Sequence, residues 1–422
     1  MKSSRIPNFH KLAIDERLKI VKTSCGLSEE EVNILKDSGG LKLEEADRMI
    51  ENLVGAFSIP VGIAVNFLIN GKDYLIPMAI EEPSVVAAAS NAARIARDGG
   101  GFHATSTEPI MIAQVQLVGV GDPFRAKVAI LSKKEEILKI ANEQDPMLVG
   151  LGGGAKDIEV RVLDSIMGQM VIVHILVDTK DAMGANVVNT MAEAVSQRIR
   201  ELAGGGTVYL RIISNLAVHR IARAWALFPC EAVGGEDAVE GILYAHAFAL
   251  ADPYRCATHN KGIMNGIAAV VQATGNDTRA IEAGAHTYAS INGKYSPLTS
   301  WERNNNGDLV GSIEVPVAVG TIGGATRHPQ AKVNLKILGV RSSRELGEVL
   351  AAVGLAQNFA AIRALATVGI QKGHMRLHAC NIAAMAGAKG ALIDKVAEII
   401  VKEKKIRVDR AREVLEELTV SK

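Results

Sequence analysis

Residues 170–202 read MVIVHILVDTKDAMGANVVNTMAEAVSQRIREL. The first part, Met170–Val177, is a nearly continuous apolar run, which is typical of a buried strand. The second part, Asn186–Leu202, repeats apolar residues at helical spacing and so predicts an amphipathic helix. Its apolar stripe consists of Val187, Met191, Ala194, Val195, Ile199 and Leu202. The turn Asp181–Asn186, which contains a glycine, joins the two parts, so the stretch predicts a strand–turn–helix unit.

The segments on either side extend this unit into a small domain. Strands are expected at Met111–Val118, Ala126–Leu131, Ile158–Leu163 and Thr207–Ile213, and a charged helix at Lys133–Asn142. Counted from Ala126, the order is strand, helix, strand, strand, helix, strand, which is the split βαβ or ferredoxin-like unit. The sequence therefore predicts a separately folded antiparallel domain over residues 109–218.

The rest of the chain predicts a larger, helix-rich domain made of residues 1–108 and 219–373. A strand pair is expected around the turn Asn70-Gly71, followed by a helix that Pro83 opens. In residues 1–108 the expected segments are a helical region 10–56 with a helix at Lys42–Leu53, strands Ser58–Ile69 and Tyr74–Pro77, and helix Ser84–Arg97. In residues 219–373 we expect long helices mixed with short strands, with a strand pair around 308–319. The segments there include His219–Ala226, Ala238–Ala249, Lys261–Thr274, Arg279–Ala289 and Ser343–Leu365.

Residues 374–422 are expected to form a C-terminal appendage with amphipathic helices at Lys389–Val401 and Val408–Leu418. The predicted fold class is α+β: a large helix-rich domain, an inserted ferredoxin-like domain and a C-terminal helical segment. The 422 residues suffice for two or three domains with cores of their own.

Composition excludes several classes of protein. Lys and Arg number 47 against 46 Asp and Glu, and only 4% of residues are aromatic, which argues against a general nucleic-acid binder. The four cysteines form no CxxC pair, which excludes a zinc ribbon and suits a reducing compartment. The N-terminus lacks a signal-peptide core and no apolar run reaches the ~18 residues of a membrane span. We expect a cytoplasmic protein without a membrane partner.

Metal chemistry is not expected. The ten histidines include no HExxH pattern. His374 and His378 are four residues apart and could share a helix face, but no partner carboxylate lies near them in the sequence. We therefore predict no metal site.

Several short motifs carry reactive side chains, each with a purely structural alternative. Glu82 precedes a helix, where it can act as an acid or complement the helix dipole. Lys261 lies in His259–Gly266, interpreted as a glycine-flanked turn, where a lysine can stabilise an oxyanion. Asp277 ends Thr274–Asp277, a turn that can bring it near Lys261 or serve only local geometry. His374 opens the appendage, where a histidine can act as a mobile acid.

Two loops suit a dinucleotide. The turn Asp181–Asn186 places a helix N-terminus where a pyrophosphate can dock, although the chain contains no GxGxxG. The loop Gly150–Gly154 follows Asp145, which can accept hydrogen bonds from a ribose and repel a 2′-phosphate, or be only a turn residue.

Taken together, the motifs resemble those of 3-hydroxy-3-methylglutaryl-CoA reductases of class II, the soluble bacterial and archaeal form. The matching segments are EEPS at 81–84, DAMGAN at 181–186, SNL at 214–216, DPYR at 252–255, HNKGIMNG at 259–266, TGND at 274–277, GLAQN at 354–358 and GHM at 373–375. The resemblance covers essentially the whole chain, including ENLVG at 51–55, which resembles the family's dimer-interface segment. One departure is Cys380, where relatives usually carry Arg.

The resemblance implies a four-electron reduction of (S)-3-hydroxy-3-methylglutaryl-CoA to mevalonate and CoA with two NAD(P)H, or the reverse oxidation. The path would pass through a hemithioacetal and mevaldehyde. Glu82 would be the carboxyl acid beside the carbonyl, and Lys261 would stabilise the oxyanion. Asp277 would tune the proton affinities of both. His374, on a mobile C-terminal segment, would protonate the departing thiolate.

The resemblance also assigns binding residues and partners. Asp145 would favour NADH, with NADPH as an alternative, and coenzyme A would enter as part of the substrate. A homodimer is implied, and trimers of dimers are common in this class. The implied substrate contacts are Ser84, Asn215, Arg255, Asn265 and Gln357, and the implied cofactor contacts are Asp145, Asp181, Met183, Gly184 and Asn186.

Two other classes of function compete with a reductase. One is a CoA- or nucleotide-binding regulator without catalysis, which is disfavoured because the four matched catalytic positions hold the needed residue types. The other is a thiolase-type transferase, which needs a nucleophilic cysteine beside a histidine. Cys256 and His259 have suitable spacing, but their sequence context does not resemble a thiolase.

Overall fold

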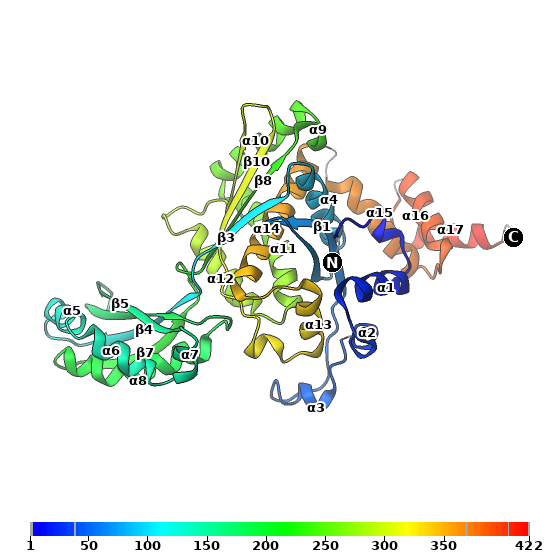
Figure 1. Cartoon of the computed structure of the whole chain (residues 1–422). Coiled ribbons are helices and arrows are strands. Elements are labelled where there is room, and N and C mark those ends of the chain that lie inside the picture. The colour runs from blue at the N-terminus through cyan, green and yellow to red at the C-terminus, as the bar shows by residue number, and fades with distance from the viewer. Residues whose placement is uncertain (1–2, 38, 368–369, 404, 421–422) are drawn as a thin grey trace.

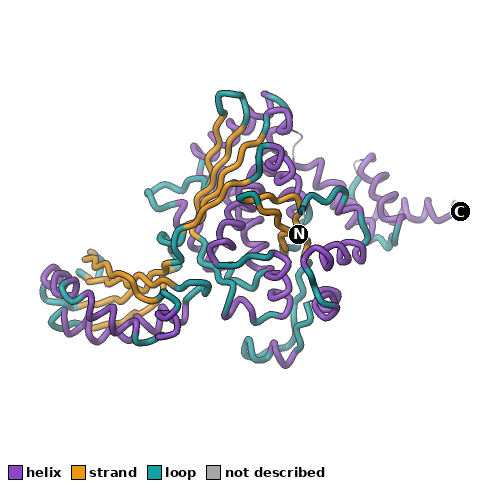
Figure 2. The backbone as a smooth tube through the Cα atoms, in the orientation of Figure 1, coloured by secondary structure: helices purple, strands orange, loops and turns teal. Residues whose placement is uncertain are grey.

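The computed structural model describes residues 3–37, 39–367, 370–403 and 405–420, and within these the side chains of 325–326, 370–377 and 420 lie outside the description. The described residues form two sheets, which Figures 1 and 2 show apart from each other. One is four-stranded with the order β5-β6-β4-β7, and the other is six-stranded with the order β2-β1-β3-β8-β10-β9. Helices accompany both, which confirms the α+β class.

The four-stranded sheet consists of β4 (Ile110–Val118), β5 (Gly154–Leu163), β6 (Met170–Asp178) and β7 (Thr207–Ser214). All neighbouring strands pair antiparallel. Helices α5 (Pro123–Leu131), α6 (Lys134–Asn142) and α7 (Pro146–Gly150) connect β4 to β5, and α8 (Ala185–Leu202) connects β6 to β7. This is the predicted ferredoxin-like order, with β4 as its first strand.

The predicted strand Ala126–Leu131 is wrong, because these residues belong to α5. Asp122 caps that helix by accepting a hydrogen bond from the Arg125 amide, and Pro123 occupies the first turn. The two buried residues, Ala126 and Ile130, are four positions apart, as on one helix face. A six-residue apolar run fits a strand or a helix equally well, and the capping residues decide between them.

The six-stranded sheet consists of β1 (Val61–Ile69), β2 (Lys72–Ala79), β3 (Phe102–Ser106), β8 (Ile221–Phe228), β9 (Thr299–Arg303) and β10 (Leu309–Pro316). The predicted hairpin around Asn70-Gly71 is confirmed, because β1 and β2 pair antiparallel across it. Helix α14 (Ser343–Ala366) packs on β3, β8 and β10, and α4 (Val85–Asp98) packs on β1. Helix α11 (Pro253–Ala273) packs on β2 and α14.

Helix α14 is the centre of the larger core. It is long and apolar enough to cross a membrane by length and composition, but 67% of its apolar window is buried inside the fold. Leu346, Val353 and Phe359 are among its buried side chains, and Phe359 stacks on Phe228 of β8 with ring centroids 4.0 Å apart. The apolar character of α14 is therefore that of a core helix.

The N-terminal region is less helical than predicted. Its elements are the 3₁₀ turn η1 (Phe9–Lys11), α1 (Ile14–Cys25), α2 (Glu29–Lys36) and α3 (Leu43–Ala46). The predicted helix Lys42–Leu53 is wrong beyond Ala46, where α3 ends, and further along Asn52 adopts a left-handed conformation with φ 55°. The apolar side chains beyond it, Val54 and Phe57, are fully or almost fully exposed, so no tertiary contact holds a helix there.

The remaining elements complete the large core and a C-terminal cluster. They are α9 (Cys230–Val233), α10 (Glu236–Ala251), α12 (Thr278–Ala289), η2 (Gly323–Thr326), α13 (Pro329–Leu338), α15 (Ile370–Met385), α16 (Ala391–Lys402) and α17 (Val408–Val420). Helices α15–α17 share their own small core and lie opposite the four-stranded sheet in Figure 1. The division into residues 1–108 with 219–373, 109–218 and 374–422 as folding units stays a prediction.

Candidate active site

A lysine, a glutamate and an asparagine meet beside helix α11. Lys261 Nζ lies 2.8 Å from Glu82 Oε2, and the amide of Asn265 lies 3.3 Å from each Glu82 oxygen. The Lys261 side chain is 60% exposed and that of Glu82 is 34% exposed. An ion pair this open contributes only about 0–1 kcal/mol to folding. The cluster is therefore accessible to a ligand and contributes little to stability.

Helix geometry places these groups together. Lys261 and Asn265 are four residues apart on α11 and so lie on one face, while Glu82 comes from the turn between β2 and α4. The next residue but one, Ser84, precedes α4 with φ 74°, a left-handed conformation that is uncommon for serine. Backbone strain of this kind clusters at functional sites.

The predicted turn at His259–Gly266 is wrong, because these residues lie in the middle of α11. The helix begins earlier, where Asp252 accepts a hydrogen bond from the Arg255 amide and Pro253 occupies the first turn. Gly266 serves packing instead, since a Cβ there would lie 2.9 Å from Gln357 Cβ on α14. The capping pair Asp252-Pro253 is the sequence signal that reveals the true start.

The hydrogen bonds and the ion pair of Asp277 lie at the start of α12. Its carboxylate caps α12 by accepting from the Arg279 and Ala280 amides, and it pairs with the Arg279 guanidinium at 3.0 Å. Across the described residues, no hydrogen bond or ion pair joins Asp277 to Lys261. Asp277 instead lines a cleft beside the four-stranded sheet.

That cleft has a volume of about 480 Å³ and lies between the start of α8 and the loop that contains η2. Gly184 immediately precedes α8 with φ 101°, and a Cβ there would lie 2.3 Å from the Thr179 methyl, so only glycine fits. Four of the five predicted cofactor contacts line the cleft, namely Asp145, Met183, Gly184 and Asn186. A helix N-terminus at such a cleft is suited to a phosphate group.

Asp181, the fifth predicted contact, is engaged elsewhere. Its carboxylate accepts a hydrogen bond of 2.8 Å from the Ser343 amide at the start of α14. It therefore ties the turn after β6 to the central helix. Asp145 is a helix cap as well as a cleft residue, since its Oδ1 accepts from the Leu148 amide of α7 at 2.9 Å.

The other predicted substrate contacts lie on three elements. Arg255 occupies the first turn of α11, where burial lowers the pKa of its guanidinium below the usual value. Gln357 of α14 is buried, and its Oε1 has no hydrogen-bond partner among the described residues. Asn215 follows β7, and its carbonyl accepts from the Ala217 amide. Of the predicted substrate contacts, Asn265 reaches Glu82. Among the described residues, no hydrogen bond joins Arg255, Gln357 or Asn215 to Glu82 or to Lys261.

His374 lies on α15, but its side chain is outside the described residues. No group of three or more potential metal ligands occurs among the residues whose side chains are described. Cys380, the departure from the family pattern, packs in the core of α15–α17 with its sulfur 4.0 Å from an Asp394 oxygen.

A thiolase-type site at Cys256 is not supported by its surroundings. The Cys256 side chain is completely buried, and burial raises the pKa of its thiol. His259 Nε2 lies 2.8 Å from the Thr299 hydroxyl, and burial lowers the pKa of this histidine to about 3. A buried, protonated thiol is a poor nucleophile.

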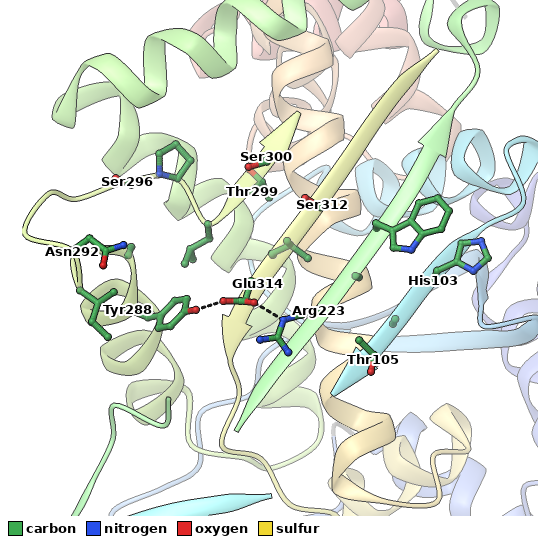
Figure 3. Close-up of a pocket in the computed structure, with 18 of the residues that line it drawn as sticks. His103, Thr105, Arg223, Tyr288, Asn292, Ser296, Thr299, Ser300, Ser312 and Glu314 are labelled. Carbon is green, nitrogen blue, oxygen red and sulfur yellow. Dashed lines mark hydrogen bonds and ion pairs between the residues drawn. The ribbon is translucent and has the colours of Figure 1, made fainter. Parts of the chain in front are cut away.

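A second cavity of about 620 Å³ lies over the six-stranded sheet, away from the predicted residues (Figure 3). Tyr288 and Arg223 both contact Glu314 there, and burial with this carboxylate raises the pKa of Tyr288 to about 12. His103 stacks on Trp225 with ring centroids 4.3 Å apart. The sequence motifs gave no indication of this cavity, because its lining comes from separate strands, the end of α12 and a loop.

Comparison with known proteins identifies a family. The model of the family described as Hydroxymethylglutaryl-coenzyme A reductase matches residues 13–379. A protein of Archaeoglobus fulgidus named 3-hydroxy-3-methylglutaryl-coenzyme A reductase is 63% identical over 417 residues, which are 99% of this chain and 95% of that protein. A Borreliella burgdorferi protein named as a probable enzyme of this kind is 40% identical over 79% of this chain and 77% of its own length.

Solved structures agree. The 3-hydroxy-3-methylglutaryl-coenzyme A reductase of Streptococcus pneumoniae superposes with a TM-score of 0.83 at 40% identity, covering 98% of this chain and 99% of that one. A structure of the class II enzyme from the same organism, bound to NADPH in open conformations, has a TM-score of 0.82 at 41% identity and covers 97% of this chain and 100% of its own. The chain therefore belongs to the hydroxymethylglutaryl-coenzyme A reductase family.

Proposed function

We propose that this protein interconverts 3-hydroxy-3-methylglutaryl-CoA and mevalonate, using a nicotinamide dinucleotide as the hydride carrier. The observation that carries the proposal is the open cluster in which Lys261 Nζ lies 2.8 Å from Glu82 Oε2. A cation and a carboxyl group side by side are what a carbonyl needs when it accepts a hydride. The test is oxidation of NADH or NADPH by the purified protein that depends on added 3-hydroxy-3-methylglutaryl-CoA.

The chain's own groups account for the charge that develops on the substrate. Lys261 stabilises the oxyanion formed at the thioester carbonyl, and Glu82 supplies a proton, which yields the hemithioacetal. When the hemithioacetal collapses, its hydroxyl proton returns to the Glu82 carboxylate, the CoA thiolate leaves and mevaldehyde remains. The mevaldehyde carbonyl then accepts the second hydride beside Lys261 and the reprotonated Glu82. His374 is proposed to protonate the thiolate, because an imidazolium is a suitable acid near neutral pH.

Asp277 and the substrate contacts complete the proposed site. Asp277, which caps α12 at the cleft, is proposed to tune the proton affinities of Glu82 and Lys261. Arg255 suits the free carboxylate of the glutaryl group, because its guanidinium can bind a carboxylate with two hydrogen bonds. Ser84, Asn215 and Asn265 are assigned to the same end of the substrate, and Gln357 to the CoA side.

The cleft beside α8 suits the dinucleotide. Each nicotinamide that binds would supply one hydride, so the reduction would use two cofactor molecules in turn. Gly184, where a Cβ would collide with Thr179, lets the turn pack closely after β6 and places the N-terminus of α8 at the cleft, where phosphates bind well. Met183, Asn186 and Asp145 would line the bound cofactor, and Asp181 would hold the turn from behind through the Ser343 amide.

The cofactor preference is proposed to rest on Asp145, whose charge would repel the 2′-phosphate of NADPH. We predict that Asp145→Asn raises the kcat/KM ratio of NADPH to NADH by roughly tenfold, because the repulsion between nearby unit charges is on the order of 1–4 kcal/mol. Asparagine keeps the capping oxygen for the Leu148 amide. Steady-state kinetics with each cofactor measure the ratio.

Asp122→Asn is the matched control for that substitution. Asp122 also precedes a proline and caps its helix, accepting from the Arg125 amide at 2.9 Å, but it does not line the cleft. The control is expected to leave the ratio unchanged. An unchanged ratio in Asp145→Asn as well would show that this carboxylate does not select the cofactor.

We propose that the protein acts as a homodimer, with trimers of dimers as a further level of assembly, in the cytoplasm. The segment 51–57 is the proposed interface between subunits, because its apolar side chains Val54 and Phe57 are 103% and 92% exposed. None of the four cysteines, Cys25, Cys230, Cys256 and Cys380, forms a disulfide among the described residues, which suits a reducing compartment.

We predict that the double variant Val54→Asp, Phe57→Asp sediments as a smaller species than the unmodified protein, because buried charges oppose association. Sedimentation velocity measures the change. Ile166→Asp is the control, since Ile166 is equally exposed but lies in the hairpin between β5 and β6. The segment is not an interface if the double variant keeps the mass of the unmodified protein.

A further inference from the structure

Arg220 is buried at the junction between the two sheets. It lies just before β8, and only 4% of its surface is exposed. Its guanidinium donates to the Thr179 hydroxyl at 3.1 Å and to the carbonyl oxygens of Ala182 at 3.1 Å and Met183 at 3.2 Å. A further hydrogen bond goes to the carbonyl of Val319, which follows β10.

All of these acceptors are neutral oxygen atoms. Burial lowers the pKa of Arg220 to about 10, so the guanidinium still carries its charge at neutral pH. A buried cation needs acceptors that replace its hydration, and here the turn after β6 supplies three of the four, two carbonyls and the Thr179 hydroxyl. The side chain and this turn therefore depend on each other.

The same turn is held from its other side. The Asp181 carbonyl accepts from the Thr321 amide at 2.8 Å. A Cβ on Gly320 would lie 2.6 Å from the Met183 nitrogen, so the two backbones are in close contact. Asn276 exchanges hydrogen bonds of 2.7 Å and 3.0 Å with the backbone of Gly320, and Asn276 directly precedes Asp277. Hydrogen bonds and close backbone contacts through Gly320 and Asn276 thus link the turn after β6 to Asp277, the proposed catalytic aspartate.

Arg220 also sets the orientation of two consecutive peptide groups. Because a trans peptide is planar with its C=O and N–H pointing in opposite directions, carbonyls held by Arg220 leave the amides of Met183 and Gly184 directed away from it. Among the described residues neither amide has a backbone hydrogen-bond acceptor. Ala182, Met183 and Gly184 all line the cleft proposed for the dinucleotide.

We propose that Arg220 is a positioning residue. Its hydrogen bonds fix the conformation of the turn 179–184, so that the cofactor binds at a fixed place relative to the substrate site. The proposal rests on the proposed function, because it assigns the cleft to the dinucleotide. Arg220 itself does not touch the ligand. Its role lies in holding the Ala182 and Met183 carbonyls, with Gly320 and Asn276 linking the turn to Asp277.

Two variants of the full chain test this role. Arg220→Met keeps the length of the side chain and removes every donor, while Arg220→Lys keeps a buried cation that cannot reach all the acceptors at once. The dissociation constants of NADH and NADPH are measured by fluorescence titration. Hydrogen exchange of residues 179–186 is measured without ligand. Steady-state kinetics give the Michaelis constants for cofactor and for substrate.

We expect both variants to raise the cofactor dissociation constant at least tenfold and to speed hydrogen exchange in the turn. The Michaelis constant for the CoA thioester substrate should change less than twofold. Val173→Ala is the control for general destabilisation, because Val173 is fully buried in β6 and remote from the turn. It should lower the melting temperature and leave cofactor binding unchanged.

The outcomes separate this role from the proposed function. If the unmodified protein binds neither cofactor, the proposed function fails. The hydrogen-exchange rates of residues 179–186 in the variants still show whether Arg220 holds the turn in place. Unchanged exchange and unchanged cofactor binding in folded Arg220→Met or Arg220→Lys would overturn the proposal. An equal loss of binding in Val173→Ala would also overturn it, because the effect would then be one of stability alone.

Discussion

Lys261→Ala is expected to abolish turnover while 3-hydroxy-3-methylglutaryl-CoA still binds. The ammonium group is the cation of the open cluster, 2.8 Å from Glu82 Oε2, and alanine leaves the oxyanion without it. Loss of one oxyanion donor costs about 10²–10³ in kcat, and loss of a full positive charge should cost at least as much. Steady-state kinetics give kcat, and calorimetric titration gives the dissociation constant of the substrate.

Lys336→Ala is the matched control for that variant. Lys336 Nζ forms a comparable ion pair with Glu31 at 2.6 Å, but it lies on α13 and joins that helix to the N-terminal region. The control should retain normal kcat, since removal of an open ion pair costs about 0–1 kcal/mol of stability. Normal turnover in Lys261→Ala would show that the lysine is not the oxyanion partner.

Glu82→Gln should reduce kcat by roughly 10²–10⁴, the usual contribution of a positioned general acid. Glutamine keeps the size of the side chain and can still accept hydrogen bonds from Lys261 and Asn265, but its amide cannot supply the proton. The substrate dissociation constant should change little. The measurement is kcat from steady-state kinetics, with the substrate dissociation constant from calorimetric titration.

Glu81→Gln provides the comparison, because Glu81 is the exposed neighbour in the same turn. Its substitution removes one negative charge at nearly the same place and should leave kcat unchanged. Equal losses in both variants would assign the effect to the local charge, and the role of Glu82 as an acid would then be wrong.

Periodicity in the sequence predicted the small sheet well, because each of its strands carries a strong pattern. Met170–Val177 became β6 (Met170–Asp178), and Asn186–Leu202 became α8 (Ala185–Leu202). Two of the errors arose where a helix start was overlooked. Asp122-Pro123 and Asp252-Pro253 both cap helices, and taking them into account would have corrected the strand at 126–131 and the turn at 259–266.

Tertiary contacts limited what the sequence could predict about the site. Glu82 and Lys261 are 179 positions apart, and only the packing of α11 beside the turn that follows β2 brings them together. The resemblance to a family predicted catalytic roles for both residues, whereas the local sequence pattern alone favoured a structural role for Glu82. Arg220 carries no local signal at all, since its acceptors Thr179 and Val319 lie 41 and 99 positions away.

The most direct test of the central claim is the stoichiometry of the reaction. Purified protein is incubated with 3-hydroxy-3-methylglutaryl-CoA and excess NADH, and separately with NADPH, while nicotinamide oxidation and free thiol are recorded together. A four-electron reduction consumes two reduced nicotinamides for each CoA thiol released and produces mevalonate. We predict a ratio of two with at least one cofactor. Absence of nicotinamide oxidation with both cofactors, or thiol release without it, would contradict the proposed function.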